Sequence, residues 1–319
     1  MLEPVYNKLL ESKLVYSNNY KIRFESTAGG YITTLIKYLF EIKFIESTIT
    51  FDRIGITFRP KIIYSFEEYN NYGSIYQEIE LFKFLKENKE HIKGRLLVTC
   101  LPCQVNSIKS LMKKNSIEVF VISLVCSSQM TKKCTESYLN FMNIDESHIK
   151  DFRYRGRGWP KYIQIETDNK KIEEKELWNY MFHSYLFNEN RCLKCTDTFG
   201  VKSDIAVSDP WLGKIMKDEK IGQSIIFYFS EKYLEILKKF EKSNLIETTK
   251  IDRNKAINSQ LTTMKKKNFI RNSSKILFLL KFLRRHKIRK ILVSNKKLLI
   301  VYSKIINKII IKLSLKDQK

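Results

Sequence analysis

Six cysteines are the residues of this chain whose type and spacing favour metal or redox chemistry. Cys100 and Cys103 form one CxxC pair, Cys192 and Cys195 form a second, and Cys126 ends a short apolar run. Groups of four soft thiolate ligands select zinc or an iron-sulfur cluster. The spacing therefore predicts that four of these thiols meet at one inorganic centre.

Two sets of four ligands fit these spacings. The first joins the two CxxC pairs into a zinc site, although far more chain separates them than the roughly 15 to 20 residues usual between zinc knuckles. The second takes Cys103, Cys126, Cys192 and Cys195, a dispersed set that suits a cluster docked against an α/β core. A third interpretation makes Cys100 and Cys103 a redox dithiol at a helix start, where thiol pKa values fall.

The elements around the first CxxC pair predict how the thiols come together. Residues 96–99 are expected to form an apolar strand, 104–113 a helix, and 119–125 a second apolar strand. A strand, helix and strand of this length form a right-handed βαβ unit with two parallel strands. Cys103 and Cys126 then emerge at the same edge of the sheet, where open α/β folds build their sites.

The remaining periodicity predicts an α/β (α+β) protein with a mixed sheet around this parallel core. The further strands expected are an edge strand at 14–16, a hairpin within 47–66, and strands at 162–166, 205–207 and 225–230. The further helices expected are 75–88, 130–143, 175–187 and 231–242.

A glycine-containing loop precedes another predicted helix. Ser26, Thr27, Gly29 and Gly30 stand before an apolar 3.6-residue period that starts at Ile32. Ser26 or Thr27 can cap that helix, and the glycines let a ligand approach the backbone amides, where the helix dipole favours an anion such as phosphate. The same residues also fit a plain glycine turn before an amphipathic helix.

Arginines, glycines and aromatics alternate in the stretch 151–159. Arg155 and Arg157 carry guanidinium groups that suit planar anions, and Trp159 can stack on a flat ring. A basic hairpin on the surface is the alternative interpretation of this stretch.

The net charge of +24 is concentrated near the C-terminus. Residues 264–319 contain 18 lysines and arginines against one acid, Asp317. Lys304, Lys308, Lys312 and Lys316 recur on one predicted helical face, and residues 306, 309, 310 and 313 are expected opposite them. A basic amphipathic helix of this kind suits an anionic membrane surface or an acidic partner, and a helical cap packed on the body is the alternative.

Localisation is predicted from what the chain does not show. No signal peptide is recognisable, and no apolar run approaches the roughly 20 residues of a membrane span. Cysteines in such a chain favour a reducing compartment. The expectation is a cytoplasmic protein, with peripheral contact at the inner membrane face through residues 264–319.

These segments together resemble the coenzyme F-420 hydrogenase/dehydrogenase beta-subunit family, over about residues 14 to 213 and in the family's order. Residues 96–105 are similar to its GTPCQ signature, 26–31 to its SSGG loop, 124–126 to its VCHG segment, 152–159 to its FRxKxxGW stretch, and 192–211 to its end with a CxxC pair and SDIxxGDFWG.

The resemblance implies a flavin and iron-sulfur oxidoreductase. A 4Fe-4S cluster would be held by the residues matching Cys103, Cys126, Cys192 and Cys195, and the second cofactor would be FAD. Flavin accepts a hydride and releases single electrons, so the implied partners are a two-electron donor and a one-electron carrier such as a ferredoxin-like protein.

Candidate cofactor contacts follow from the same resemblance. The loop of Ser26, Thr27, Gly29 and Gly30 is the first candidate for FAD, and Arg155, Arg157 and Trp159 are candidates for flavin or substrate. Ser127-Ser128 replaces the family's His-Gly, which leaves the donor and the substrate open.

The chain is thus expected to contain an oxidoreductase domain at 1–253 and a basic helical tail at 254–319. Short relatives that lack a ferredoxin module look like bacterial proteins of surface-polysaccharide pathways. The rival from another class is a non-catalytic zinc-binding protein whose tail binds nucleic acid or membrane, although no specific nucleic acid is expected.

Overall fold

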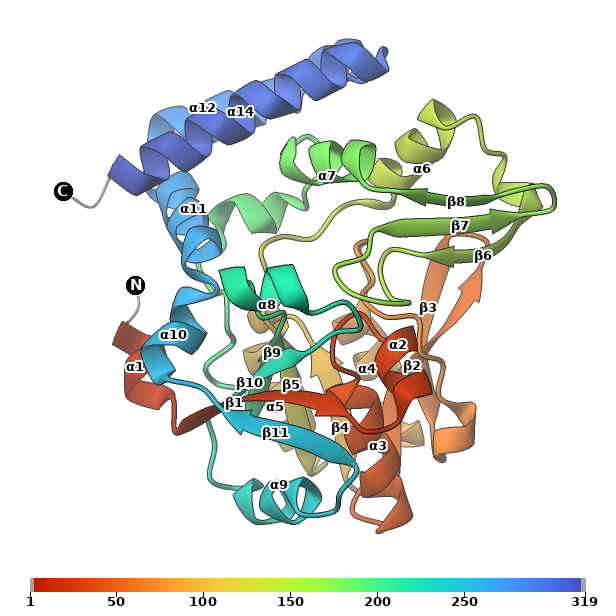
Figure 1. Ribbon diagram of the computed structural model, residues 1–319, viewed down its shortest axis with the longest axis vertical. Coiled ribbons are helices and arrows are strands. Elements are labelled where there is room, and N and C mark those ends of the chain that lie inside the picture. Colours follow the sequence, from red (N-terminus) through yellow and green to blue (C-terminus); the bar gives the residue numbers. More distant parts are fainter. Residues whose placement is uncertain (1–2, 317–319) are drawn as a thin grey trace.

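An eight-stranded mixed sheet forms the centre of the molecule, in a computed structural model that describes residues 3–316 (Figure 1). Its strand order is β11-β1-β10-β9-β5-β4-β2-β3. The four central strands β9, β5, β4 and β2 are parallel to one another. All other neighbouring pairs are antiparallel. The strands are β1 (Glu11–Ser17), β2 (Ser47–Ile54), β3 (Thr57–Ile63), β4 (Leu96–Cys100), β5 (Val119–Leu124), β9 (Ile205–Ser208), β10 (Ser224–Tyr228) and β11 (Ile246–Lys250). The predicted mixed α/β fold with a parallel βαβ core is confirmed.

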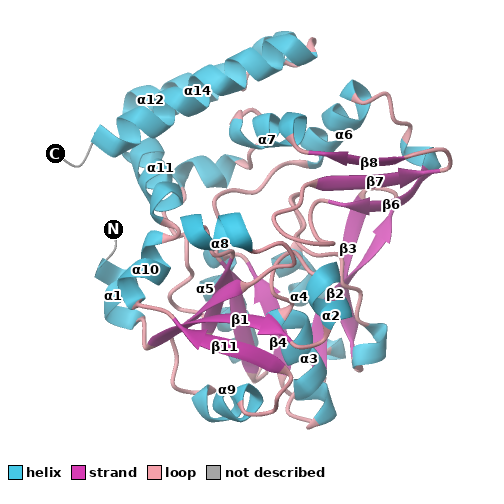
Figure 2. Ribbon diagram, viewed as in Figure 1, coloured by secondary structure: helices cyan, strands magenta, loops and turns pink. Residues whose placement is uncertain are grey.

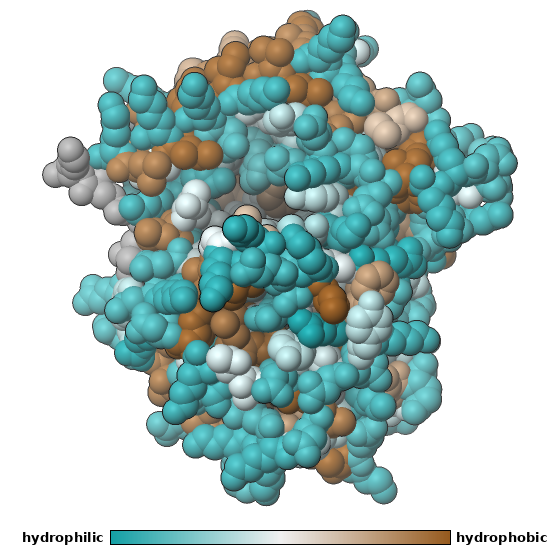
Figure 3. All heavy atoms as spheres, viewed as in Figure 1, coloured by the Kyte–Doolittle hydropathy of each residue, from teal (hydrophilic) through white to brown (hydrophobic). Residues whose placement is uncertain are grey.

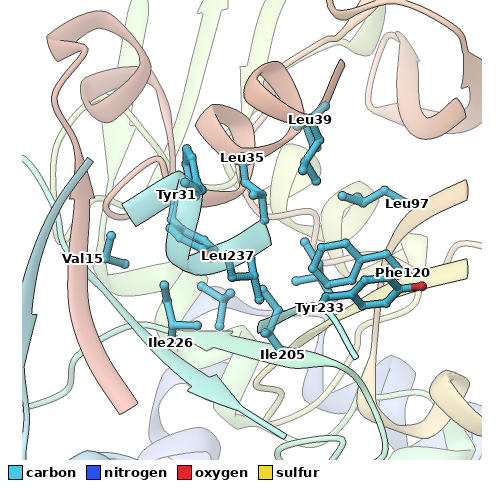
Figure 4. Packing of buried hydrophobic residues seen from close by; sticks show 14 of the residues in the cluster. Val15, Tyr31, Leu35, Leu39, Leu97, Phe120, Ile205, Ile226, Tyr233 and Leu237 are labelled. Atoms are coloured by element: carbon cyan, nitrogen blue, oxygen red, sulfur yellow. The ribbon is translucent and has the colours of Figure 1, made fainter. Parts of the chain in front are cut away.

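Helices cover both faces of this sheet, which explains its continuous apolar strands. On one face, α3 (Tyr31–Glu41) and α9 (Leu234–Glu241) bury Leu35 and Leu237 against Phe120 and Ile205 of the strands (Figure 4). On the other face, α4 (Leu81–Glu87) and α5 (Val105–Lys114) cover residues of β4 and β5. Each fully buried aliphatic side chain contributes about 1.5 to 3 kcal/mol.

A second, three-stranded antiparallel sheet stands beside the first (Figure 2). It consists of β6 (Ile149–Arg153), β7 (Ile163–Thr167) and β8 (Lys171–Glu174), and it packs with α6 (Lys132–Phe141) and α7 (Glu176–His183). The sequence predicted one of these strands but not the sheet, because β6 and β8 are short, polar and carry no clear alternation.

The C-terminal helices pack on the body. They are α10 (Arg253–Asn258), α11 (Leu261–Asn272), α12 (Ser274–Leu283), α13 (His286–Leu292) and α14 (Lys296–Lys316). Leu299 of α14 is fully buried and belongs to the same apolar cluster as Phe152 and Trp178 of the second sheet region. Within residues 3–316, none of the helices combines the length and the apolar character that a membrane span requires.

The remaining helices and turns are short. They are α1 (Glu3–Lys8), α2 (Tyr20–Glu25) and α8 (Gly213–Asp218), with 3-10 turns η1 (Phe66–Glu68), η2 (Lys89–His91), η3 (Pro102–Gln104), η4 (Glu146–His148) and η5 (Asn190–Lys194).

Two sequence expectations are wrong in detail, and a third is confirmed. The predicted edge strand at 14–16 belongs to β1, which is interior because the polar strand β11 pairs along its outer side. The predicted hairpin within 47–66 is confirmed as β2 and β3, and β2 also pairs with β4, which joins the hairpin to the large sheet. The helix expected at 75–88 begins only at Leu81, because buried Gln77 donates its side-chain amide to the Ile56 carbonyl and holds this stretch extended.

Candidate functional site

The first and second thiol-bearing turns emerge at the same edge of the large sheet. Cys103 lies in η3, directly after β4, and Cys126 lies two residues beyond the end of β5. The two strands pair in parallel from Leu96 opposite Val119 to Cys100 opposite Ser123. This register brings both turns to one end of the sheet, as the βαβ prediction required.

The loop that carries the second CxxC pair is fastened to these turns. The Cys126 amide donates to the Thr198 carbonyl at 2.9 Å, and the Glu189 amide donates to the Gln129 carbonyl at 2.8 Å. Gly200 fits so closely that a Cβ there would lie 2.3 Å from Ser123 Oγ and 3.1 Å from Pro102 Cα. Three segments distant in sequence therefore converge at this edge.

The Cys192 sulfur accepts a hydrogen bond from the segment after Cys126. The donor is the Gln129 backbone amide, at 3.3 Å. Amide-to-sulfur hydrogen bonds stabilise a thiolate and tune the electronics of any metal centre that it binds.

The four predicted ligand sulfurs lie within each other's electrostatic field. The pKa of Cys126 is raised to about 12, mainly by burial. The neighbouring Cys192, Cys103 and Cys195 add to this increase, and the charge of Lys267 opposes it. Partial burial also raises the pKa of Cys103 and of Cys192. Cys195 adds to the increase at Cys103, and Cys103 adds to the increase at Cys192. These thiols must release their protons when they bind metal, because only the thiolate is a metal ligand.

Cys100 is buried, whereas the four thiols of the other set are exposed or half-buried. It is buried with Ile49, Val98 and Met112 in the apolar cluster under α4 and α5. Burial raises the pKa of the Cys100 and Cys103 thiols, whereas a redox dithiol at a helix start needs a lowered pKa. The geometry thus favours the set with Cys126 over both interpretations that use Cys100.

The four predicted thiols do not form a ready-made site for one metal ion. Among residues 3–316, no group of three or more His, Cys, Asp or Glu side chains is arranged to hold a single metal ion. Four thiolates on one zinc lie about 3.8 Å apart, because each Zn–S bond is about 2.3 Å. A four-iron core is larger, so its ligands stand farther apart.

A cavity of about 740 Å³ adjoins the thiols. Its lining runs from the Ser26–Thr27 loop and Gly30 past Arg155 to Cys126. Apolar pockets of roughly 300 to 1,000 Å³ with a few polar groups are typical of cofactor sites.

The N-terminus of α3 opens into this cavity. Gly30 has φ +74° and precedes the helix, and Gly30, Tyr31, Ile32 and Thr33 all line the cavity. In the described part of the chain, no side chain caps this helix end. Free amides at a helix N-terminus form a ready anion site.

Of the predicted loop residues, Ser26, Thr27 and Gly30 line the cavity, whereas Gly29 supports the packing of the loop. Ser26 Oγ accepts a hydrogen bond from Asn71 at 2.9 Å, and Thr27 Oγ1 accepts one from the Ser74 amide. A Cβ at Gly29 would lie 2.5 Å from the Val15 carbonyl oxygen, so Gly29 permits the close packing of the loop on β1.

Arg155 lines the cavity and is held by an acid that follows β9. Its two terminal nitrogens donate to the Asp209 carboxylate at 2.7 and 3.0 Å. Trp159 is buried and donates its indole N–H to the same carboxylate at 2.8 Å. Arg157 instead pairs with Asp151 at 2.7 Å and Glu25 at 3.4 Å. Arg155 is thus the predicted residue of this stretch that faces the cavity.

Several cavity residues went unpredicted. They are Tyr76, Trp178, His183, Trp211 and Lys266. Trp211 lies 5.6 Å from the Trp159 ring and the same distance from the Arg155 guanidinium. The pairing of Asp209 with Arg155 and Trp159 also could not be predicted, since it depends on the tertiary fold.

The fold and the thiol-rich edge are those of a family of redox subunits. Residues 93–254, just over half of the chain, match the family model that describes the C terminus of the beta subunit of coenzyme F420 hydrogenase/dehydrogenase. The chain belongs to this family, and at this level it is an oxidoreductase subunit.

A solved structure shares the fold across nearly the whole chain. It is a chain from the F420-reducing NiFe hydrogenase complex of Methanosarcina barkeri, with a TM-score of 0.59 and 17% sequence identity. The similarity covers 90% of this chain and 92% of that chain. A comparison with curated proteins found no match.

Proposed function

We propose that this protein is an electron-transfer oxidoreductase subunit with two cofactors. Cys103, Cys126, Cys192 and Cys195 would hold a 4Fe-4S cluster, and the adjoining cavity would hold FAD. When bound, the flavin exchanges two electrons with a donor and the cluster exchanges one. The observation that supports this most is that Cys126 belongs both to the thiol group and to the cavity wall.

The residues of the chain serve two roles in this proposal. The amides at the start of α3 bind the anionic part of the flavin, because the helix dipole is positive there. Cys103 is exposed, so a cluster that it held would lie near the surface, where a protein carrier such as a ferredoxin could dock. A multi-subunit setting like that of the solved relative is part of the proposal, and a role in surface-polysaccharide pathways stays a prediction.

The test is the metal and flavin content of anaerobically purified protein. Iron and sulfide with broad absorbance near 400 nm, an order-of-magnitude expectation for thiolate-to-iron charge transfer, together with bound flavin support the proposal. Cys126→Ser should lose the iron, whereas Cys134→Ser should keep it, because Cys134 lies buried in the cluster of the second sheet. Zinc without colour, or a site that needs Cys100 instead of Cys126, would support the zinc-binding rival.

We also propose a membrane-facing surface on the C-terminal helices, where exposed apolar side chains accompany the basic charge. Phe278 is 69% exposed, Val301 54% and Ile305 55%, and Figure 3 shows apolar side chains gathered over α12 and α14. Lys304 and Lys308 each precede an exposed isoleucine, so they border this apolar stripe. Anionic lipids attract such lysines by about 1 kcal/mol each.

Co-sedimentation with vesicles tests this surface. Phosphatidylserine-containing vesicles should bind the full chain more tightly than phosphatidylcholine vesicles, and less so at high salt. Val301→Ser with Ile305→Ser should weaken binding at least tenfold. Ile54→Ser is the matched control, because Ile54 is equally exposed but lies on the β2–β3 hairpin. Unchanged binding by the double variant would contradict this proposal.

A further inference from the structure

A lysine of α11 reaches into the thiol group. Lys267 is only 7% exposed, and its Nζ donates to the Cys126 carbonyl oxygen at 3.2 Å and to the Asp197 carbonyl oxygen. Its charge acts on the Cys103, Cys126 and Cys192 thiols, where it opposes the effect of burial. Lysines are almost never this buried unless a compensating group is close.

Two further contacts fix α11 over the CxxC loop. Leu193, between the two cysteines, is buried against Phe269 and Ile270 of α11. Arg271 donates to Thr196 Oγ1 at 2.9 Å, one residue after Cys195. The helix therefore contacts the loop between the two cysteines and directly after them, although it lies beyond the end of the family match at residue 254.

We propose that Lys267 is a positioning residue whose fixed charge supports loading of the thiol site and raises the reduction potential of its cluster. The inference rests on the proposed 4Fe-4S site. Four thiolates bring four negative charges into a half-buried place, and one ammonium group beside them offsets part of this charge. Reduction by one electron adds a further negative charge, so a neighbouring cation favours the reduced state.

Three full-length variants separate charge from packing. Lys267→Gln keeps a hydrogen-bond donor without the charge, and Lys267→Arg keeps the charge. Lys265→Gln is the control, because two residues along a helix turn the side chain to nearly the opposite side. Iron and sulfide are counted in each protein, and the midpoint potential is measured by spectroelectrochemistry.

Lys267→Gln should shift the redox equilibrium at least tenfold toward the oxidised state, which is 59 mV lower for one electron. Lys267→Arg and Lys265→Gln should match the wild type. An unshifted potential in loaded Lys267→Gln, or an equal shift in Lys265→Gln, would overturn the inference.

Failure to load is equally informative. If Lys267→Gln binds no iron while Lys267→Arg does, the charge is needed for loading, as proposed. If neither variant loads, the role of Lys267 is packing and the inference is wrong. A wild type without iron would instead reject the proposed cluster itself.

Discussion

The Arg155–Asp209 ion pair is the charged contact on which the cavity wall depends. Burial alone would lower the pKa of Arg155, but Asp209 outweighs it, and the pKa is raised. The same carboxylate also accepts the Trp159 indole N–H. Asp209 therefore orients two residues of the 151–159 stretch. This stretch is thus part of the cavity wall and not only a basic hairpin on the surface.

Asp209→Asn should strongly destabilise the fold. The substitution leaves the buried Arg155 guanidinium without its countercharge, and breaking a buried pair costs about 3 to 5 kcal/mol. Urea unfolding measures the loss. Asp168→Asn is the control, since exposed Asp168 pairs with exposed Lys150 and its loss should leave the urea midpoint nearly unchanged. Equal losses in the two variants would contradict the assigned role.

His183 should make the fold sensitive to acid. Burial, and then the charge of Lys266, lowers the pKa of His183 to about 3, against about 6.5 in the unfolded chain. Between these values only the unfolded chain takes up the proton, so this contribution is complete above pH 6.5 and is lost as pH falls toward 3. The expected loss is at most about 1.4 kcal/mol per pH unit.

Urea unfolding at a series of pH values checks this expectation. His183→Gln should show a shallower loss of stability between pH 6.5 and 3 than the wild type does. His286→Gln should follow the wild type, because His286 is exposed on α13. A His183→Gln profile parallel to the wild type would show that His183 does not cause the slope.

At the scale of elements, the backbone conformation at the start of α3 shapes the proposed flavin contact. Gly30 adopts φ +74°, and a Cβ there would lie 3.1 Å from the Arg23 Cα. Gly30→Ala should therefore strain the loop and lower bound flavin several-fold, a rough expectation for a residue forced into the left-handed region.

Gly213→Ala is the matched control for this helix end. A Cβ at Gly213 meets nothing within 4 Å, so flavin content should stay at the wild-type value. Flavin is quantified by absorbance after denaturation, and a melting curve separates loss of binding from loss of folding. Full flavin content in Gly30→Ala would rule out the helix start as the flavin contact.

The periodicity of apolar residues predicted the parallel core of the sheet. It did not predict which side of a helix packs on the body when the helix has apolar residues on several sides. The runs expected as strands at 96–99 and 119–125 are short, apolar and bounded by polar turns. The sequence therefore predicted both strands and the position of the Cys103 and Cys126 turns at one edge of the sheet. In α14, the expectation grouped Ile306, Ile309, Ile310 and Leu313 on one face. The structure buries Ile306 and Ile310 and leaves the other two exposed.

The placement of the lysines in α11 also could not be predicted from the sequence. Lys265, Lys266 and Lys267 are consecutive in the sequence, yet only Lys267 turns toward the thiols, while Lys266 lines the cavity. Composition cannot distinguish them, because the choice depends on how α11 docks. The role of each of these lysines therefore depends on the tertiary fold and cannot be predicted from its own segment.

For the whole molecule, the division into a domain at 1–253 and a tail at 254–319 stays a prediction, and packing makes it testable. Leu299 is fully buried among residues of the second sheet, whereas Val301, two residues away, is 54% exposed. Leu299→Ala should cost about 2 to 5 kcal/mol, as other large-to-small core changes do. Val301→Ala should change stability by about 0.5 kcal/mol or less.

The decisive readout is whether this loss spreads beyond α14. If the C-terminal helices are part of one cooperative unit, Leu299→Ala lowers the unfolding midpoint recorded by far-UV circular dichroism and by Trp178 and Trp159 fluorescence to the same extent. An independent tail would instead melt in a separate early transition, leaving the fluorescence midpoint unchanged. Coincident transitions are expected, because Leu299 lies in the same apolar cluster as Trp178, and α11 fastens the thiol loop to the helices that follow.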